Sequence, residues 1–187
     1  MTVKTVGVLA LQGDFAAHRQ ALLRAGAGRV LEVRTAAELA AVDGLVIPGG
    51  ESTTMLKLIE AGSLFQPLRE FGSSRPIFGT CAGAILLATE VTHPAQLSLA
   101  LMDIAVERNA YGRQLDSRVA HIQIDGVDLE AVFIRAPIIR RVGPAATVLA
   151  TYQNDPVLVG QGRHMVATFH PELTSDVRVH HLFLEKL

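Results

Sequence analysis

The stretch that decides the fold runs from residue 76 to residue 88 and reads PIFGTCAGAILLA. Its first part is an apolar run of strand length, its second part is an apolar helix former, and Cys81 lies between Gly79 and Gly83 at the junction. This spacing matches a G-x-nucleophile-x-G elbow, in which a sharp strand-to-helix turn projects the nucleophile, here with cysteine in place of serine. A lone cysteine is more often a small buried hydrophobic residue. The two flanking glycines favour the nucleophile.

The composition limits the classes of protein to consider. The chain has 187 residues, 49% of them hydrophobic and 19% charged, which is typical of one globular domain with a substantial core. A net charge of -1 provides no basic field for nucleic acid. The single cysteine cannot form an internal disulfide, the N-terminal apolar run is too short for a secretory signal, and no apolar run reaches the roughly 18 residues that span a bilayer. We therefore expect a cytoplasmic protein with no nucleic-acid or membrane partner.

Apolar runs and helical patterns alternate in the first half of the chain. We expect strands at residues 5–10, 29–34, 44–47 and 77–79, and helices at residues 14–25, 36–41 and 52–61. Fully apolar strands that alternate with helices indicate a parallel sheet covered on both faces.

The second half is richer in strands separated by turns. Strand-like runs lie at residues 99–107, 118–125, 131–134, 147–152, 157–160 and 164–169, and a closing helix is expected at residues 175–186. The sequence shows no internal repeat or linker. It predicts one α/β domain over residues 1–187, with a mostly parallel central sheet flanked by helices and an antiparallel addition in the second half.

Two more loops that follow predicted strands carry polar residues. His170 and Glu172 lie two apart on an extended segment and therefore share a face, so they are candidates for a general base and the carboxylate that orients it. The loop PGGEST at residues 48–53 has glycines that let backbone N–H groups approach an anion, although it also fits a plain turn capped by Ser52 or Thr53. Since open parallel sheets bind ligands at the carboxyl ends of their strands, we expect these loops to meet Cys81.

Six motifs together carry a family resemblance. They are LQG at 11–13, PGGESTTM at 48–55, FGTCAG at 78–83, ERNAYGRQ at 107–114, FIRAP at 133–137 and FHPELT at 169–174. With these motifs the chain resembles the class I (triad) glutamine amidotransferases, and among them the glutaminase subunits of pyridoxal 5'-phosphate synthase. The motifs occur in the family's order and cover nearly the whole chain.

The resemblance implies the class I glutamine amidotransferase fold and a set of site residues. In that family Cys81 would be the nucleophile, and His170 and Glu172 would complete the triad. The positions that match the family's glutamine-binding residues are Gly50, Glu51, Ser52, Arg108, Ile134 and Arg135. Hydrolysis would pass through a glutamyl thioester without a metal or organic cofactor.

Chemistry gives some of these residues specific expected roles. Backbone N–H groups near Gly50 and Ala82 are the candidates for an oxyanion hole. Arg108 offers a planar fork for the α-carboxylate of glutamine, with a surface ion pair as the alternative. The neighbouring histidines His180 and His181 lack partners at ligand spacing and are interpreted as packing or surface residues.

The resemblance also implies a partner. Ammonia would pass to a separate (β/α)8-barrel synthase subunit that makes pyridoxal 5'-phosphate, in a large ring-shaped complex, and we expect that subunit to control activity through Gly49 and Gly50. Two alternatives remain open: a glutaminase for another synthase, such as imidazole glycerol phosphate synthase, and a non-catalytic regulatory module on the same fold.

Overall fold

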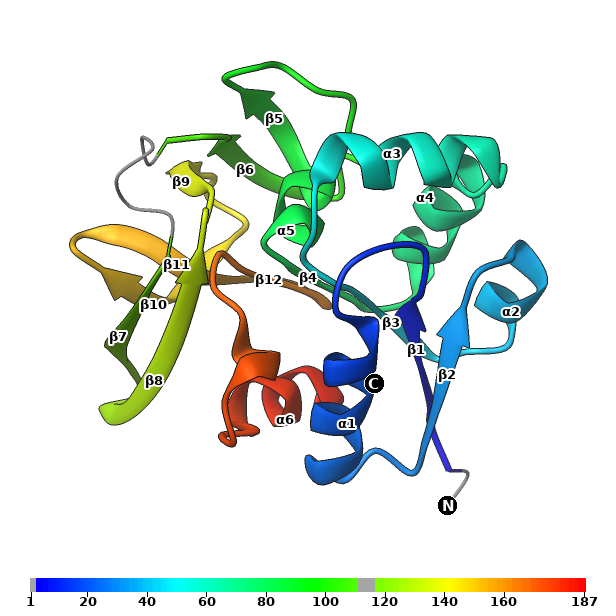
Figure 1. Ribbon diagram of the computed structural model, residues 1–187, viewed down its shortest axis with the longest axis horizontal. Coiled ribbons are helices and arrows are strands. Elements are labelled where there is room, and N and C mark those ends of the chain that lie inside the picture. The colour runs from blue at the N-terminus through cyan, green and yellow to red at the C-terminus, as the bar shows by residue number, and fades with distance from the viewer. Residues whose placement is uncertain (1–2, 111–116) are drawn as a thin grey trace.

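A seven-stranded sheet organises the protein in the computed structural model, which describes residues 3–110 and 117–187 (Figure 1). Its strands are β1 (Thr5–Leu9), β2 (Arg29–Val33), β3 (Gly44–Ile47), β4 (Ile77–Thr80), β10 (Thr147–Tyr152), β11 (Asp155–Gln161) and β12 (His164–Ala167). The strand order is β10-β11-β12-β4-β3-β1-β2. From β12 to β2 all neighbours are parallel, whereas β11 and β10 are added antiparallel. The predicted fold class, including the antiparallel addition, is confirmed.

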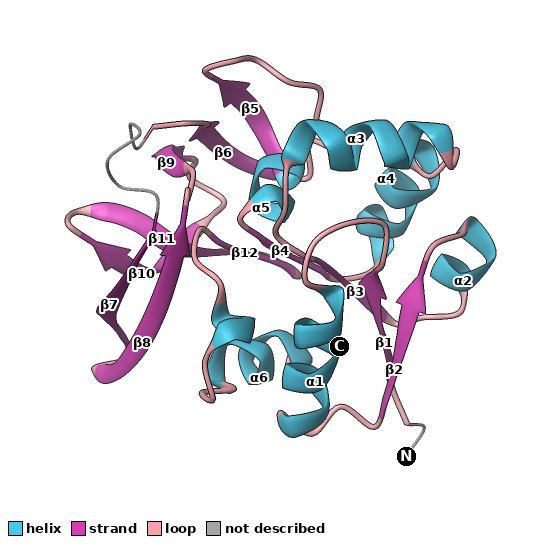
Figure 2. Ribbon diagram, viewed as in Figure 1, coloured by secondary structure: helices cyan, strands magenta, loops and turns pink. Residues whose placement is uncertain are grey.

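Helices cover both faces of this sheet (Figure 2). One face carries α1 (Phe15–Arg24) and α6 (Arg178–Leu184); the other carries α2 (Ala36–Ala40), α3 (Ser52–Ala61), α4 (Phe65–Ser74) and α5 (Ala82–Leu87). Each face has its own hydrophobic cluster, with Leu22 and Phe183 in the first and Leu56 and Leu86 in the second. Burial on both faces explains why strands such as β3 are apolar at every position. No helix in the described ranges is long and apolar enough to cross a membrane.

Two small sheets lie beside the main one. The first has three strands, β5 (Ala88–Thr92), β6 (Met102–Glu107) and β9 (Ile138–Val142), and the second is a hairpin of β7 (Ser117–Ile124) and β8 (Val127–Ile134). A short 3-10 turn, η1 (Pro171–Leu173), follows β12. β6 and β8 each end next to residues that line the candidate site.

Several element boundaries differ from the prediction, and three elements were missed. The pattern of α4 was obscured by Pro67 and Gly72, but Pro67 lies in the first turn, where a missing N–H is tolerated. Gly72 packs against Leu101, so a β-carbon there would displace the tip of that side chain. β5 follows α5 without an intervening turn, and β9 carries two consecutive arginines, so neither has the expected pattern of a strand. The predicted strand at residues 99–107 begins only at Met102, and the strand predicted at 131–134 begins at Val127.

Candidate active site

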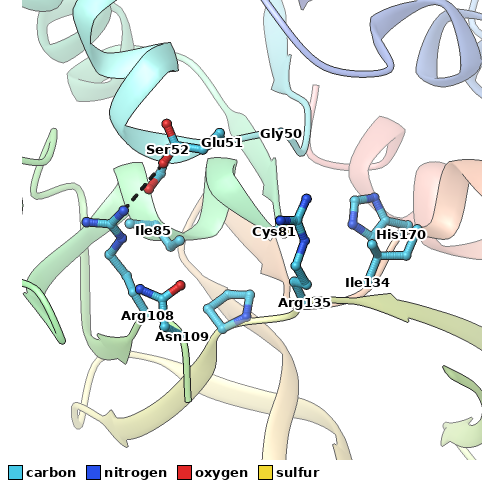
Figure 3. Close-up of a pocket in the computed structure, with 11 residues that line it drawn as sticks. Gly50, Glu51, Ser52, Cys81, Ile85, Arg108, Asn109, Ile134, Arg135 and His170 are labelled. Atoms are coloured by element: carbon cyan, nitrogen blue, oxygen red, sulfur yellow. Dashed lines mark hydrogen bonds and ion pairs between the residues drawn. The ribbon is translucent and has the colours of Figure 1, made fainter. Parts of the chain in front are cut away.

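The three predicted loops meet at one edge of the sheet. β12, β4 and β3 lie side by side and run parallel. Their carboxyl ends bring together residues 48–53, called the glycine loop below, with Cys81 and His170. These residues line one cleft of about 190 Å³ (Figure 3). At about 30 Å³ per water molecule, the cleft has room for a small metabolite such as an amino acid.

Cys81 occupies a strained turn between β4 and α5. Its backbone has φ 49° and ψ -102°, a conformation that residues with a β-carbon rarely adopt. Both flanking glycines are required for close packing: a β-carbon on Gly79 would lie 2.5 Å from the Gly83 carbonyl, and one on Gly83 would overlap the carbonyl oxygen of Ile47. The backbone N–H of Cys81 donates to Ala167 O at 2.9 Å, which ties the turn to β12. The elbow expected from the glycine spacing is therefore present.

His170 lies between Cys81 and Glu172. Its Nδ1 is 2.8 Å from Glu172 Oε1, and its backbone N–H donates to Val132 O at 2.7 Å. Burial lowers the pKa of His170, but hydrogen bonds with Cys81 and Glu172, together with their charges, outweigh burial and raise it to about 10. The imidazole therefore holds its proton at neutral pH. That is the state expected of an imidazolium that stabilises a neighbouring thiolate.

The glycine loop passes directly over this pair. A β-carbon on Gly49 would lie 2.5 Å from Cε1 of His170 and 3.3 Å from Cβ of Cys81, so glycine is required at this close approach. Gly50 has φ 146°, which disfavours any other residue. On the other side of the loop, Gln12 Oε1 accepts a hydrogen bond from the backbone N–H of Glu51 at 3.1 Å. The LQG motif thus supports the glycine loop, a contact that sequence spacing did not predict.

The N-terminal cap of α3 differs from the prediction. A cap at Ser52 or Thr53 was the alternative interpretation of this loop, but the cap is Glu51, whose carboxylate accepts from the N–H groups of Thr53 (3.0 Å) and Thr54 (2.7 Å). Desolvation raises the pKa of Glu51, but the hydrogen bonds from Thr53 and Thr54 together outweigh it and lower the pKa to about 2. Ser52 is instead buried and donates from Oγ to Gln96 Oε1 at 2.9 Å. Gln96 lies in the segment 89–98, which carried no recognisable motif.

Arg108 lies at the mouth of the cleft with only 11% of its side chain exposed. Its Nη2 donates to Thr53 Oγ1 at 2.9 Å and lies 3.5 Å from Glu51 Oε1, the contact drawn as a dashed line in Figure 3. The guanidinium is therefore held at the cleft by partners on α3. Arg108 thus forms an ion pair, and this ion pair lies at the cleft.

The remaining predicted binding residues also line the cleft. Ile134 and Arg135 come from the end of β8, and Arg135 has a positive φ of 43°. The cleft also contains three residues that were not predicted, namely Ile85, Asn109 and Pro137. Residues 111–114 of the ERNAYGRQ motif lie outside the described residues. Among the other predicted residues, Ala82 is fully buried at the start of α5, and Glu172 lies behind His170.

Three further polar residues reach the triad from behind. They are His18 on α1, Thr80 at the end of β4 and His180 on α6, and all three are buried. His18 contacts both of the others. His180 is a packing residue, as interpreted, but it has a hydrogen-bond partner 162 positions away that sequence spacing could not predict. The sequence signal that could have indicated a buried partner is the position of His18, one turn before Leu22 on the buried face of α1. His181 is exposed, 3.4 Å from Glu185.

No cluster of three or more His, Cys, Asp or Glu side chains with the geometry of a metal site occurs in residues 3–110 and 117–187.

Comparisons with known proteins agree with this geometry. The model of the SNO glutamine amidotransferase family matches residues 8–187. A protein of Solibacter usitatus named "Pyridoxal 5'-phosphate synthase subunit PdxT" is 60% identical, over 99% of this chain and 100% of the relative. A protein of the same name from Deinococcus radiodurans is 55% identical, over 96% of this chain and 95% of the relative. A solved structure described as "Crystal structure of glutamine amidotransferase" superimposes with a TM-score of 0.90 at 46% identity, over 97% of both chains.

Proposed function

This chain belongs to the SNO glutamine amidotransferase family, and we propose that it hydrolyses L-glutamine to L-glutamate and ammonia as the glutaminase subunit of a pyridoxal 5'-phosphate synthase. The observation that carries the proposal is the strained Cys81 beside a His170–Glu172 pair, in a cleft of amino-acid size. Relatives that match nearly the full length of this chain carry the name of the synthase subunit.

The first half-reaction is attack of the Cys81 thiolate on the side-chain amide carbon of glutamine. Protonated His170 beside the sulfur stabilises the thiolate, and then gives its proton to the departing ammonia. Glu172 accepts from Nδ1 of His170, so the other ring nitrogen, Nε2, is directed to the reacting atoms. A glutamyl thioester on Cys81 is the product of this step.

Negative charge that develops on the amide oxygen needs N–H donors. The backbone N–H groups of Gly50 and Ala82 are the proposed donors, since Ala82 follows Cys81 in the chain and Gly50 lines the same cleft as Cys81. In the second half-reaction His170 takes a proton from water, the hydroxide attacks the thioester, and glutamate leaves with the thiol restored. The reaction consumes one water and one glutamine per ammonia.

Residues around the cleft are proposed to hold the amino-acid end of the substrate. Arg108 provides the cation for the α-carboxylate, and the carboxylate of Glu51 provides an acceptor for the α-ammonium. Ser52, Ile134 and Arg135 complete the set of proposed glutamine contacts.

The acceptor of ammonia is proposed to be a separate synthase subunit with a (β/α)8-barrel fold, in a ring-shaped complex. This finer part of the proposal depends on the family resemblance. The names of the relatives favour it over an imidazole glycerol phosphate synthase. Intact Cys81, His170 and Glu172 disfavour a non-catalytic module.

The test is reconstitution. The purified chain is mixed with the synthase subunit from the same organism, and glutamate release and pyridoxal 5'-phosphate formation are measured with glutamine or ammonium as nitrogen source. We expect glutamine to support both products, and a Cys81→Ala chain to support vitamin formation only with ammonium. Product formation from glutamine with the Cys81→Ala chain would refute the proposed function.

A further inference from the structure

A buried polar chain runs from the triad carboxylate to the two helices behind the sheet. Glu172 Oε2 lies 3.2 Å from His18 Nε2, which is also 3.0 Å from Thr80 Oγ1, and His18 Nδ1 lies 3.0 Å from His180 Nε2. His18 and His180 have no exposed surface. Phe78 packs edge-on against both rings, with centroid distances of 6.5 and 6.0 Å. The proposed mechanism uses neither histidine.

These buried contacts matter because they reach the carboxylate of the triad. Glu172 Oε1 faces His170, but Oε2 is buried and makes no aligned hydrogen bond among the described residues. His18 Nε2 lies 3.2 Å from this oxygen. Leaving a buried carboxylate oxygen without a donor is unfavourable, so whether Nε2 carries a proton decides whether Glu172 is stabilised there.

Electrostatics assign the protons. A lone pair on His18 Nε2 would stand 3.2 Å from a carboxylate oxygen and repel it, so the proton of His18 belongs on Nε2. Nδ1 of His18 then accepts, and His180 must donate to it from its own Nε2. His180 Nδ1 then carries no proton and is an acceptor. This nitrogen is buried and has no hydrogen-bond partner among the described residues. An unpaired acceptor fits a neutral ring, since burial lowers the pKa of His18 and of His180 below neutrality.

We propose that His18, with its tautomer set by His180, is a positioning residue that keeps the Glu172 carboxylate turned toward His170. His18 acts through Nε2, which lies 3.2 Å from Glu172 Oε2 and 3.0 Å from Thr80 Oγ1 and so connects the triad carboxylate to the residue that precedes Cys81. This inference rests on the proposed function only for its kinetic consequences. The geometry of the His18–Glu172 contact is independent of the substrate.

Two substitutions separate positioning from simple packing. His18→Leu preserves bulk but removes the donor, whereas His18→Gln can place an amide N–H near the position of Nε2. His164 provides a matched control, because it is also buried but lies at the opposite end of β12, where its Nδ1 accepts from the N–H of Ile77 at 3.2 Å. The variants His18→Leu, His18→Gln and the control His164→Gln are first compared with wild type by circular dichroism and thermal unfolding.

The kinetic test uses glutamine hydrolysis by each variant in complex with the synthase subunit. Loss of supporting groups behind a functional residue typically costs about 10- to 100-fold. We expect His18→Leu to lower kcat by that factor with KM unchanged, His18→Gln to restore most of the rate, and His164→Gln to match wild type. Equal kcat in folded His18→Leu and His164→Gln would overturn the inference, while an inactive wild-type complex would instead refute the proposed function.

A second measurement needs no turnover and can be made on each variant that folds. The pKa of His170 is followed by NMR of the histidine ring nitrogens in wild type, His18→Gln, His18→Leu and His164→Gln. Glu172 helps to raise the pKa of His170 through its contact with Nδ1, so that pKa should fall when the carboxylate is no longer held toward His170. We expect a fall in His18→Leu and not in His18→Gln or His164→Gln. An unchanged pKa in folded His18→Leu, or an equal fall in His18→Gln, would refute the positioning role.

Discussion

Gly49 stands against His170 so closely that a β-carbon on the glycine would lie 2.5 Å from Cε1 of the imidazole. The same β-carbon would lie 3.3 Å from Cβ of Cys81. One backbone segment therefore touches both the proposed nucleophile and the proposed base. Any movement of this loop changes the surroundings of both, which connects the chemistry of the triad to the conformation of the glycine loop.

Replacing Cys81 by alanine should abolish hydrolysis without unfolding the chain. Alanine keeps the β-carbon that the turn already accommodates, and removing a triad nucleophile typically costs on the order of 10⁴-fold or more. The same change removes the hydrogen bond and charge that do most to raise the pKa of His170, so that pKa should fall from about 10 toward its ordinary value. Glutamate release and NMR titration of His170 check the two parts. A Cys81→Ala chain that hydrolyses glutamine at the wild-type rate would contradict the assignment.

His170→Asn should cost more activity than Glu172→Gln. The imidazole transfers protons in both half-reactions, whereas the carboxylate orients it through the 2.8 Å contact and stabilises its charge. In a comparable serine triad, loss of the histidine exceeds loss of the carboxylate by about 10- to 100-fold. Values of kcat measured for the two variants in the complex test this order. The reverse order would mean that Glu172 itself takes part in proton transfer.

Arg108→Lys should raise KM for glutamine, by about tenfold, with a smaller effect on kcat. Lysine keeps the charge but not the planar fork that can bind a carboxylate with two hydrogen bonds. Arg69 is an exposed arginine on α4, so Arg69→Lys serves as the control. An unchanged KM in Arg108→Lys would assign Arg108 to its ion pair with Glu51 and remove it from the substrate site.

Acid should destabilise the protein through the buried histidine pair. Desolvation lowers the pKa of His180 to about 4, so the unfolded chain binds a proton at that residue near pH 6.5 and the folded chain does not. The contribution of the neutral His180 ring to the free energy of unfolding is fully present above pH 6.5. It is lost as the pH falls toward 4, and the loss is roughly 3 kcal/mol. Burial shifts the pKa of His18 in the same direction.

The adjacent histidine supplies the control for this effect. Urea unfolding between pH 4 and 7 should show a weaker pH dependence for His180→Gln than for wild type. His181→Gln should match wild type, because the His181 side chain is 59% exposed. Equal slopes for the two variants would show that the buried ring is already protonated in the folded state.

Much of the sheet and site was predictable because the signals are local. The apolar run of β3, the helix Ser52–Ala61 and the glycines beside Cys81 each reflect a constraint within a few residues. The helix cap at Glu51 was missed because serine and threonine are the more usual capping residues and glutamate reached the same N–H groups.

The contacts behind the triad were not predictable, since they join distant parts of the chain. His18 and Glu172 lie 154 positions apart in sequence, on α1 and on the turn after β12. Only the arrangement of the strands places them side by side. The same holds for Gln12, whose side chain supports the glycine loop across 39 positions.

The last prediction concerns control by the synthase subunit. The Gly49 carbonyl oxygen packs so closely on Gly13 that a β-carbon there would overlap it. Because the C=O and N–H of a trans peptide point in opposite directions, this contact directs the N–H of Gly50 away from Gly13. Glycine on both sides makes the peptide unit easy to reorient, so packing of a partner near residues 12–13 can change where that N–H points.

An oxyanion donor that keeps this orientation only in the complex would act as a switch, since losing one such donor typically costs about 10²- to 10³-fold in rate. We therefore expect glutamine hydrolysis by the isolated chain to be slower than in the complex by about that factor. Gly50→Ala should reduce the stimulated rate, because the φ of 146° is unfavourable for alanine and the new β-carbon would lie 2.6 Å from Gln12 Oε1. Gly160→Ala is the control, since its β-carbon would meet Leu149 at an ordinary 3.5 Å. Steady-state turnover with and without the synthase subunit decides the matter: equal rates in the two conditions would exclude partner control at this loop while leaving the roles of Cys81 and His170 intact.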